Sequence, residues 1–413
     1  MSRRVVITGL GPITCIGTGR EAFWKAIRAG RSGITRVTRF DTGEFKAHCA
    51  GEINDWDPTA FFPPHRLKRL DRFAQFAVAS ARLALEDARL PWSSEEPNDR
   101  IGVSFGSALG GVARAEHEHA SFLKNGPRGV SQTLALQVFG GSANSNIAIE
   151  CGFRGPGTTN SNSCASGVVA VGEALRYIRD GWADGMIAGG AEAPLSPLTF
   201  AAFDFIKTMS RWDGDPHLAC RPFDLERDGF VMAEGAASLV LEEYEHARRR
   251  GAPIYAEVRG YALNNDAYHM TSPMPGGEPV SACMRAALAR AALAPEDIDY
   301  INAHASSTQL NDANEIAAIK NVFGAHASSL AVSGTKAFTG HPLGATGAIE
   351  TAICALALRD GYLPPTLHHR TPDPACDLDI VPNTGRVQPL RAVMNNAFGF
   401  GGINSVLVLS RVD

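Results

Sequence analysis

The sequence shows no marked excess of either charge sign. Its 39 lysines and arginines stand against 43 aspartates and glutamates, so the 413-residue chain carries a net charge of −4. Without a strong positive field, the chain has no general attraction for nucleic acid or for an anionic membrane. We therefore expect neither as a partner.

Hydrophobic runs long enough for a bilayer are also missing. The longest uncharged stretches, near 129–149 and 155–172, are rich in Asn, Ser, Thr and Gly. A spanning helix needs about 20 apolar residues instead. Near the start, Gly9, Gly11 and Pro12 interrupt the apolar segment that a secretory signal would require. The expected location is therefore the cytoplasm.

Cysteine is scattered: it occurs eight times and nowhere as a Cys-x-x-Cys pair. This distribution favours free thiols in a reducing compartment over a disulfide framework. Apolar residues make up 45% of the chain and charged ones 20%, a globular balance that excludes disorder. The length fits two or three domains, or one large duplicated fold.

Short β-rich runs alternate with helical patterns along the chain, which predicts an α/β fold with a mixed or parallel sheet. The expected helices cover 19–30, 279–293 and about 312–323. The expected strands are 5–8, 101–104, 185–188, 237–242, 255–258, 298–303, 330–333 and 405–410.

Two further segments, 165–177 and 344–358, are apolar almost all round and rich in Ala and Gly. A helix without a polar face is buried, and small side chains let neighbouring backbones approach closely. One such helix lies in each half of the chain, and a polar loop precedes each. The pattern indicates an internal duplication with a central layer of paired helices, in one body without a linker.

The loop before the first of these helices carries Cys164. A thiol at a helix N-terminus lies at the positive end of the helix dipole, among unsatisfied N–H groups, so we expect a lowered pKa and a reactive thiolate. The local pattern is equally compatible with an inert buried cysteine. For the other cysteines, which follow no such turn, the inert interpretation is favoured.

Three more segments are candidates for a site. His304 follows the strand expected at 298–303 and begins a hydroxyl-rich turn, although a capping or core histidine would look the same. Lys336 and His341 lie among glycines at the start of the second buried helix, where packing would not favour a lysine. The Gly-Phe-Gly-Gly turn at 399–402 could aim backbone N–H groups inward.

Together these groups suit acyl chemistry on thioesters. A thiolate accepts an acyl group, and two neutral imidazoles can stabilise the enolate of a second thioester. A cysteine hydrolase needs only one histidine. A zinc site is disfavoured because the ligands lack short spacing and Lys336 would oppose a cation. A dinucleotide fingerprint is excluded because Thr14 stands where its third glycine belongs.

These motifs resemble the β-ketoacyl-[acyl carrier protein] synthases, most closely the synthase II type and its type II polyketide relatives. The resemblance rests on Cys164 before Ala-Ser-Gly, on His304, on the run Gly-Thr-Lys-Ala-Phe-Thr-Gly-His ending at His341, and on Gly-Phe-Gly-Gly. It extends from about residue 2 to 411. It implies the thiolase fold, an α/β fold of two similar halves in five layers, αβαβα. The implied halves are 1–255, with the nucleophile, and 256–413, with both histidines.

The implied activity is an acyltransferase reaction. An acyl thioester held on Cys164 undergoes decarboxylative Claisen condensation with malonyl-[acyl carrier protein], giving 3-oxoacyl-[acyl carrier protein] in fatty-acid or type II polyketide elongation. His304 and His341 would support decarboxylation and stabilise the enolate. The backbone N–H groups of Cys164 and Phe400 would form the oxyanion hole, and Phe400 would also gate malonyl entry.

The resemblance assigns further roles. Lys336 would hold an electrostatic network with Glu350, Asp312 and Glu315. The phosphopantetheine arm would bind Thr271, Ser306 and Thr308, and Leu109 would line the acyl pocket. Neither a diffusible cofactor nor a metal is implied.

An acyl carrier protein is the implied partner, together with a second copy of the chain or a homologous ketosynthase-like subunit. The basic segment 65–72, with Lys68 and Arg69, would dock an acidic carrier, and Lys207 would join it. A solvated helix face is the alternative for that segment.

Two other functions stay open at this stage. A non-decarboxylating thiolase would need a second cysteine where Gly-Phe-Gly-Gly stands, and a chain-length-factor-like partner would have lost Cys164. The sequence also departs from the family at Ala305 and Ser306, where Gly and Thr are usual. Alanine disfavours the positive φ that glycine permits, which raises the prospect of a specialised acyl chain.

Overall fold

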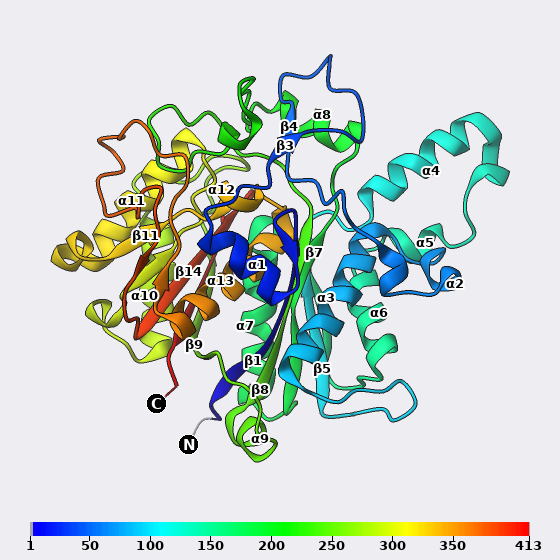
Figure 1. The fold of residues 1–413 in the computed structure, drawn as a ribbon, viewed down its shortest axis with the longest axis horizontal. Coiled ribbons are helices and arrows are strands. Elements are labelled where there is room, and N and C mark those ends of the chain that lie inside the picture. The colour runs from blue at the N-terminus through cyan, green and yellow to red at the C-terminus, as the bar shows by residue number, and fades with distance from the viewer. Residues whose placement is uncertain (1–2, 413) are drawn as a thin grey trace.

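The computed structural model describes residues 3–412, in which one strand order occurs twice in a single sheet (Figure 1). The N-terminal half has the order β6-β5-β7-β8-β1 and the C-terminal half the order β11-β10-β14-β15-β9. The strands of the first half are β1 (Val5–Thr14), β5 (Ile101–Gly106), β6 (Gly157–Asn160), β7 (Gly185–Glu192) and β8 (Gly235–Glu243). Those of the second are β9 (Ala256–Asn265), β10 (Tyr300–Asn302), β11 (Ala331–Ser333), β14 (Ala392–Gly399) and β15 (Ile403–Ser410).

Strand direction repeats as well as strand order. In each half the three strands farthest from the junction are parallel, and the next two pairings are antiparallel. The halves join where β1 pairs with β9 through Val6 with Glu257 and Ile7 with Ala256. This repetition confirms the predicted duplication.

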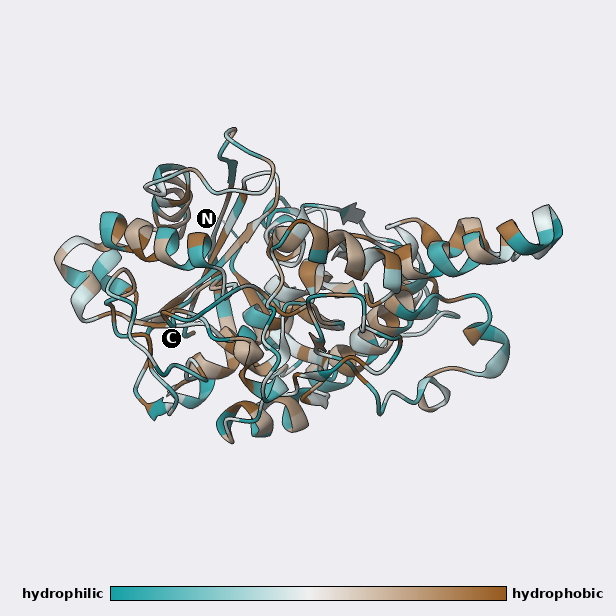
Figure 2. Cartoon of the chain, turned by 90° about the horizontal axis from the view of Figure 1, so that it is seen from above, coloured by the Kyte–Doolittle hydropathy of each residue, from teal (hydrophilic) through white to brown (hydrophobic). Residues whose placement is uncertain are grey.

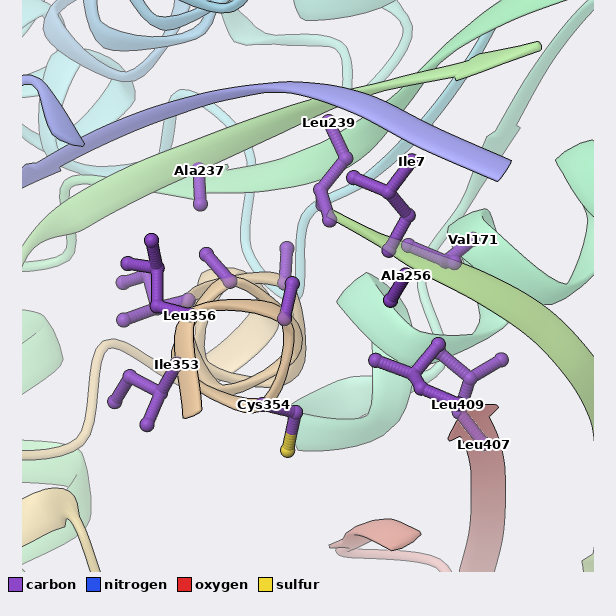
Figure 3. Packing of buried hydrophobic residues seen from close by; sticks show 14 of the residues in the cluster. Ile7, Val171, Ala237, Leu239, Ala256, Ile353, Cys354, Leu356, Leu407 and Leu409 are labelled. Atoms are coloured by element: carbon purple, nitrogen blue, oxygen red, sulfur yellow. The ribbon is translucent and has the colours of Figure 1, made fainter. Parts of the chain in front are cut away.

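The helices α7 (Ser166–Arg179) and α13 (Thr346–Asp360) lie between the two halves of the sheet. In Figure 3, side chains from strands of both halves lie around α13, with Ala237 and Leu239 of the N-terminal half on one side and Leu407 and Leu409 of the C-terminal half on another. A Cβ on Gly167 would lie 2.5 Å from the backbone nitrogen of Ala348, so the glycine is what lets α7 approach α13. The two buried helices predicted from composition are confirmed.

The outer layers complete the fold. In the N-terminal half, α3 (Arg72–Ala88) and α6 (Ser142–Cys151) cover the sheet, and in the C-terminal half α10 (Glu278–Ala291) and α11 (Gln309–Phe323) do so (Figure 1). The result is the αβαβα arrangement expected of a thiolase fold. At one end, α4 (Val112–Asn125) projects from the body (Figures 1 and 2).

The remaining elements are short and lie mostly in the connections. The helices are α1 (Arg20–Arg28), α2 (Pro64–Leu67), α5 (Leu134–Val138), α8 (Pro197–Phe205), α9 (Tyr244–Arg249) and α12 (Lys336–Thr339). The strands are β2 (Gly17–Thr18), β3 (Thr35–Arg36), β4 (Cys49–Ala50), β12 (Tyr362–Leu363) and β13 (Arg386–Val387).

Most predicted strands and helices are present, but β1, expected over residues 5–8, continues through Gly9 and Gly11 to Thr14. A Cβ on Gly9 would lie 2.1 Å from the carbonyl oxygen of Ala84, and one on Gly11 2.0 Å from that of Ser80. These glycines therefore let α3 pack onto the strand rather than turn the chain. The strand β14 was not predicted.

All eight cysteines are free thiols, as expected. Between residues 3 and 412, no helix has both the length and the apolar character needed to cross a bilayer.

Candidate active site

Cys164 lies in a single 3-10 turn, Ser163–Ala165, between β6 and α7. The end of β14 packs directly on this turn: a Cβ on Gly399 would lie 3.1 Å from the backbone nitrogen of Cys164. This contact brings the backbone N–H of Phe400 toward the thiol sulfur, where it favours the thiolate and lowers the pKa of Cys164. The Gly-Phe-Gly-Gly turn thus closes over Cys164 from the other half of the fold.

The expected lowering of the Cys164 pKa is wrong. Burial raises the pKa of the thiol to about 11, because the charged form is poorly solvated there. The Ser163 hydroxyl, the charge of Lys336 and the Phe400 N–H act in the opposite direction, whereas the carboxylate of Glu192 raises the pKa further. At neutral pH the resting residue is a thiol, so its proton must leave during the reaction.

This state has a measurable consequence. Alkylation of Cys164 by iodoacetamide should accelerate about tenfold per pH unit between about pH 7 and pH 10, because only the thiolate attacks and its fraction rises until the pKa is reached. Mass spectrometry of the peptide that contains Cys164, sampled over time at each pH, gives the rate. A rate that levels off below pH 8 would show that the thiol is already ionised near neutrality.

The two histidines lie together at the ends of different elements of the C-terminal half. His304 follows β10, and His341 follows α12; their ring centroids are 5.5 Å apart, with an interplanar angle of 78°. Both are almost fully buried, and aromatic rings pack on them, Phe398 on His304 at 5.6 Å and Phe230 on His341 at 5.4 Å. Burial and then the charge of Lys336 hold both pKa values well below the usual histidine value, so both rings are neutral.

Lys336 and Glu315 fix the backbone at His304. The ammonium of Lys336 donates to the carbonyl oxygen of His304 and, at 2.6 Å, to Oε1 of Glu350. From the other side, the carboxylate of Glu315 accepts the backbone N–H groups of His304 at 2.9 Å and Ala305 at 2.8 Å. Both peptide groups that flank the histidine are therefore held by buried charges, which orients its ring.

Backbone strain gathers at the same place. Ser163 (φ 52°) precedes Cys164, Ala305 (φ 35°) and Ser307 (φ 66°) follow His304, and Leu343 (φ 36°) follows His341. A non-glycine residue in this region costs roughly 1–2 kcal/mol. Ala305 therefore adopts the positive φ that the usual glycine would allow, at a cost in strain rather than by rearranging the turn. The packed surroundings that hold such residues are typical of functional sites.

A cavity of 520 Å³ connects these groups with the surface. It is lined by Cys164, His304, His341, Phe400, Thr271, Ser306, Thr308, Glu315 and Lys207 among the predicted residues. The ring of Phe400 stacks on Phe203 with centroids 6.2 Å apart, so it stands at the cavity wall beside the nucleophile. Ser306 and Thr308 lie on one side of the cavity, with their hydroxyl oxygens 3.0 Å apart.

Other predicted residues lie outside this cavity. Lys336 and Glu350 are buried behind it. Asp312 accepts the backbone N–H of Phe223 at 3.0 Å and lies 3.8 Å from Arg227 Nε. These contacts are with residues other than the two histidines.

The remaining predictions concern the acyl pocket and the docking surface. Leu109 packs on the apolar cluster that contains Cys164. Lys68 and Arg69 are exposed beside α2, on the side of α4 and α5 rather than at the cavity mouth (Figure 1).

Four residues of the site were not singled out in the sequence. Glu192, at the end of β7, accepts the backbone N–H groups of Leu109 and Gly344. Asn396 donates to Glu315 at 3.0 Å, and Thr346 bonds the ring of His341. Arg211 lines the cavity next to Lys207. Glu192 could have been noticed, because it is an acidic residue at the end of a strand that is otherwise apolar. The sequence around the other three residues does not distinguish them from residues that only pack.

The fold and the site together define a class: a thiolase-fold enzyme with one thiol and two neutral imidazoles in one cavity. No group of three or more His, Cys, Asp or Glu side chains in residues 3–412 is arranged to hold a metal ion.

Comparison with known proteins gives the family. The N-terminal domain of the beta-ketoacyl synthases matches residues 2–247 and their C-terminal domain matches 255–370. The 3-oxoacyl-[acyl-carrier-protein] synthase 2 of Coxiella burnetii is 45% identical over 410 residues, 99% of either chain. That of Staphylococcus aureus is 43% identical over 412 residues, 100% of this chain and 99% of the other. The chain belongs to the beta-ketoacyl synthase family, and it is an acyltransferase.

Solved structures agree. A ketosynthase–chain length factor for ishigamide superposes with a TM-score of 0.93 at 37% identity, over 100% of both chains. A type II polyketide ketosynthase in complex with its acyl-carrier protein and bound to a hexaketide gives 0.91 at 37%, again over 100% of both. A beta-ketoacyl synthase of Burkholderia phymatum gives 0.92 at 35% identity over the full length of each chain. The division of this chain at residue 255 stays a prediction.

Proposed function

We propose that the protein elongates acyl chains by decarboxylative condensation, in which Cys164 holds the acyl chain as a thioester. The thiol attacks an acyl thioester, the pantetheine sulfur leaves, and the thiol proton passes through an imidazole to that sulfur. Because the Cys164 pKa is about 11 and the histidine pKa values are low, neither charged form accumulates at rest. The proton therefore moves as the carbon–sulfur bond forms.

Condensation then needs a carbanion. The malonyl carboxylate leaves as carbon dioxide, and its electron pair becomes the enolate of the remaining thioester. Neutral His304 and His341 donate N–H to the enolate oxygen and so stabilise the negative charge that develops there. The enolate attacks the acyl-cysteine carbonyl, the Cys164 and Phe400 N–H groups stabilise the oxyanion, and the cysteine sulfur leaves and takes a proton.

The substrates arrive on a carrier protein, in this proposal. Two of the solved structures that this chain resembles are a ketosynthase with its acyl-carrier protein and a ketosynthase–chain length factor. Here the hydroxyls of Thr271, Ser306 and Thr308 line the cavity and suit the amides of a phosphopantetheine arm. Lys207 and Arg211, both exposed and both lining the cavity, place positive charge where an acidic carrier would dock. Docking at Lys68 and Arg69 stays a prediction.

A second ketosynthase-like chain is the other proposed partner. β6 ends the sheet order, so its outer edge has backbone groups available for a further strand. Next to it, α5 and α6 expose apolar side chains: Leu136 is 64% exposed and Ile149 62%. Such a patch beside an open strand favours a protein partner. An identical copy and a homologous subunit would both fit this description.

The observation that carries the proposal is the convergence of Cys164, His304 and His341 on one cavity. Neither alternative accounts for it as well, because a thiolase needs a second reactive cysteine and a non-catalytic partner needs none. No diffusible cofactor enters the scheme, and we place the reaction in the cytoplasm.

The test uses purified protein with acyl- and malonyl-[acyl carrier protein]. Intact mass should show one acyl group on the chain, and malonyl-[acyl carrier protein] should then release carbon dioxide and form 3-oxoacyl-[acyl carrier protein]. Condensation with acetyl-CoA alone, without carbon dioxide release, would favour the thiolase instead. A chain that takes up no acyl group from any carrier substrate would contradict the proposal.

A further inference from the structure

The first residue of α13 contacts the ring of a proposed catalytic histidine. The hydroxyl oxygen of Thr346 lies 2.8 Å from Nδ1 of His341, and both residues are at least 97% buried. Because His341 also lines the cavity, this contact leaves Nε2 as the ring nitrogen that can meet a substrate. Thr346 itself is absent from the cavity wall, so it can act only through the histidine.

The direction of this hydrogen bond decides what His341 can do. A neutral imidazole carries one proton, on either Nδ1 or Nε2. If the threonine hydroxyl donates to Nδ1, the proton lies on Nε2, and Nε2 can donate to an enolate oxygen. If Nδ1 donates to the hydroxyl instead, Nε2 has only a lone pair and would repel that oxygen.

Electrostatics favours the first arrangement. Thr346 begins the 15-residue helix α13, whose N-terminus carries partial positive charge and therefore favours a lone pair, not an N–H, on the ring atom that faces it. The buried ammonium of Lys336 opposes double protonation of the ring and so keeps it neutral, with one nitrogen free to accept a hydrogen bond. The helix dipole then favours Nδ1 as that acceptor.

We propose that the Thr346 hydroxyl is a positioning group that donates to Nδ1 of His341 and so holds the proton on Nε2, toward the substrate. The inference rests on the proposed function of His341 in condensation. It does not extend to His304, whose Nδ1 is buried without a hydrogen-bond partner among the described residues. The two histidines therefore differ in how their protons are placed, although both face the same cavity.

The experiment compares Thr346→Val, which keeps the shape and removes the hydroxyl, with Thr346→Ser, which keeps the hydroxyl. Condensation by Thr346→Val should fall about tenfold in kcat, because one neutral hydrogen bond to the reacting ring is lost. Acylation of Cys164, followed by intact mass, should change little, and Thr346→Ser should recover most of the condensation rate. Thr351→Val is the matched control: it is a buried threonine on the same helix, and its hydroxyl donates to the carbonyl of Gly347 at 2.7 Å.

A spectroscopic measurement separates positioning from a structural role. In wild-type protein labelled with ¹⁵N-histidine, His341, assigned with a His341→Gln variant, should show a protonated Nε2 and an unprotonated, hydrogen-bonded Nδ1. In Thr346→Val the Nδ1 resonance should move toward that of a free lone pair or of a tautomer mixture.

Three results would overturn the inference. These are a protonated Nδ1 in the wild type, equal losses of acylation and condensation in Thr346→Val, and a Thr346→Val variant that condenses at the wild-type rate. If wild-type protein takes up no acyl group, the proposed function fails, and the labelled spectrum still reports the tautomer on its own.

Discussion

Replacement of Cys164 by alanine is expected to abolish condensation, with a loss of at least about 10⁴-fold in kcat, because removal of a nucleophile leaves only binding and oxyanion stabilisation. The side chain is the one thiol on the cavity wall, so no neighbouring cysteine can take its place. Alanine also leaves the turn at Ser163–Ala165 and its contact with β14 intact. Carrier-protein binding should therefore persist, as judged by calorimetry with acyl-[acyl carrier protein].

The matched control is Cys151→Ala. Cys151 is also buried, but it lies at the end of α6 among apolar neighbours and outside the cavity. It should lose some stability and keep its condensation rate and its acyl-enzyme adduct. Condensation by Cys164→Ala at even 1% of the wild-type rate would mean that another group carries the acyl chain, since the nucleophile's share of catalysis is about 10⁴-fold or more.

Local pattern predicted the two central helices and marked Cys164, His304 and His341 as candidates, and the family resemblance then selected them. Cys164, His304 and His341 each follow a strand or turn and precede a buried or apolar segment, a signal contained within about ten residues. The duplication could be predicted because it places one Ala- and Gly-rich helix in each half. The length of β1 could not, since Gly9 and Gly11 serve contacts with α3, which lies some 70 residues away in the chain.

The properties of the site depend on contacts across much longer separations. Glu192 reaches Gly344 over 152 residues, and Phe400 comes to Cys164 from the other half of the fold. The helix dipole predicted a lowered thiol pKa, but desolvation, which is set by tertiary packing, outweighs it and raises the value to about 11. A sequence reveals which groups can react, while their protonation states follow from what surrounds them.

The duplicated topology explains why these groups meet. Cys164 lies in the turn before α7, and the corresponding turn before α13, Leu343–Ala345, follows His341 directly. The two helices begin side by side, so their preceding turns touch. His304 follows β10, the strand of the C-terminal half that corresponds to β5 in the strand order. The N-terminal half therefore contributes Cys164 to the cavity, and the C-terminal half contributes both imidazoles.

Replacement of Lys336 by methionine is the second large effect that we expect, and it acts on stability as well as on activity. Lys336 is 1% exposed and Glu350 2% exposed, and they form a 2.6 Å ion pair. Removing one partner leaves a buried carboxylate without compensation, at a cost of about 3–5 kcal/mol. The carbonyl of His304 loses its donor at the same time, so condensation should fall along with the free energy of unfolding.

The loss of stability in Lys336→Met should depend on pH, and the pKa of Glu350 determines whether it grows or shrinks as pH rises. Its pKa is already raised by burial from 4.5 to about 7, and Lys336 opposes that rise through its charge and hydrogen bond. Without the lysine the folded-state pKa rises further. A carboxyl whose folded pKa exceeds its unfolded one stabilises the fold below the unfolded value, and this contribution is lost as pH rises through the folded value. Guanidinium unfolding should therefore show a smaller deficit for Lys336→Met at pH 5 than at pH 8.

The double variant Lys336→Met/Glu350→Gln separates charge burial from lost packing. Removing the second charge should recover most of the stability and flatten the pH dependence, because a neutral amide does not need a counter-ion. Condensation should stay low in the double variant, since the ammonium that held the His304 carbonyl is still missing. Equal deficits at pH 5 and pH 8, or a double variant no more stable than Lys336→Met, would show that Glu350 is not the group left uncompensated. In that case the cost would come from the apolar surroundings of the lysine chain rather than from its charge.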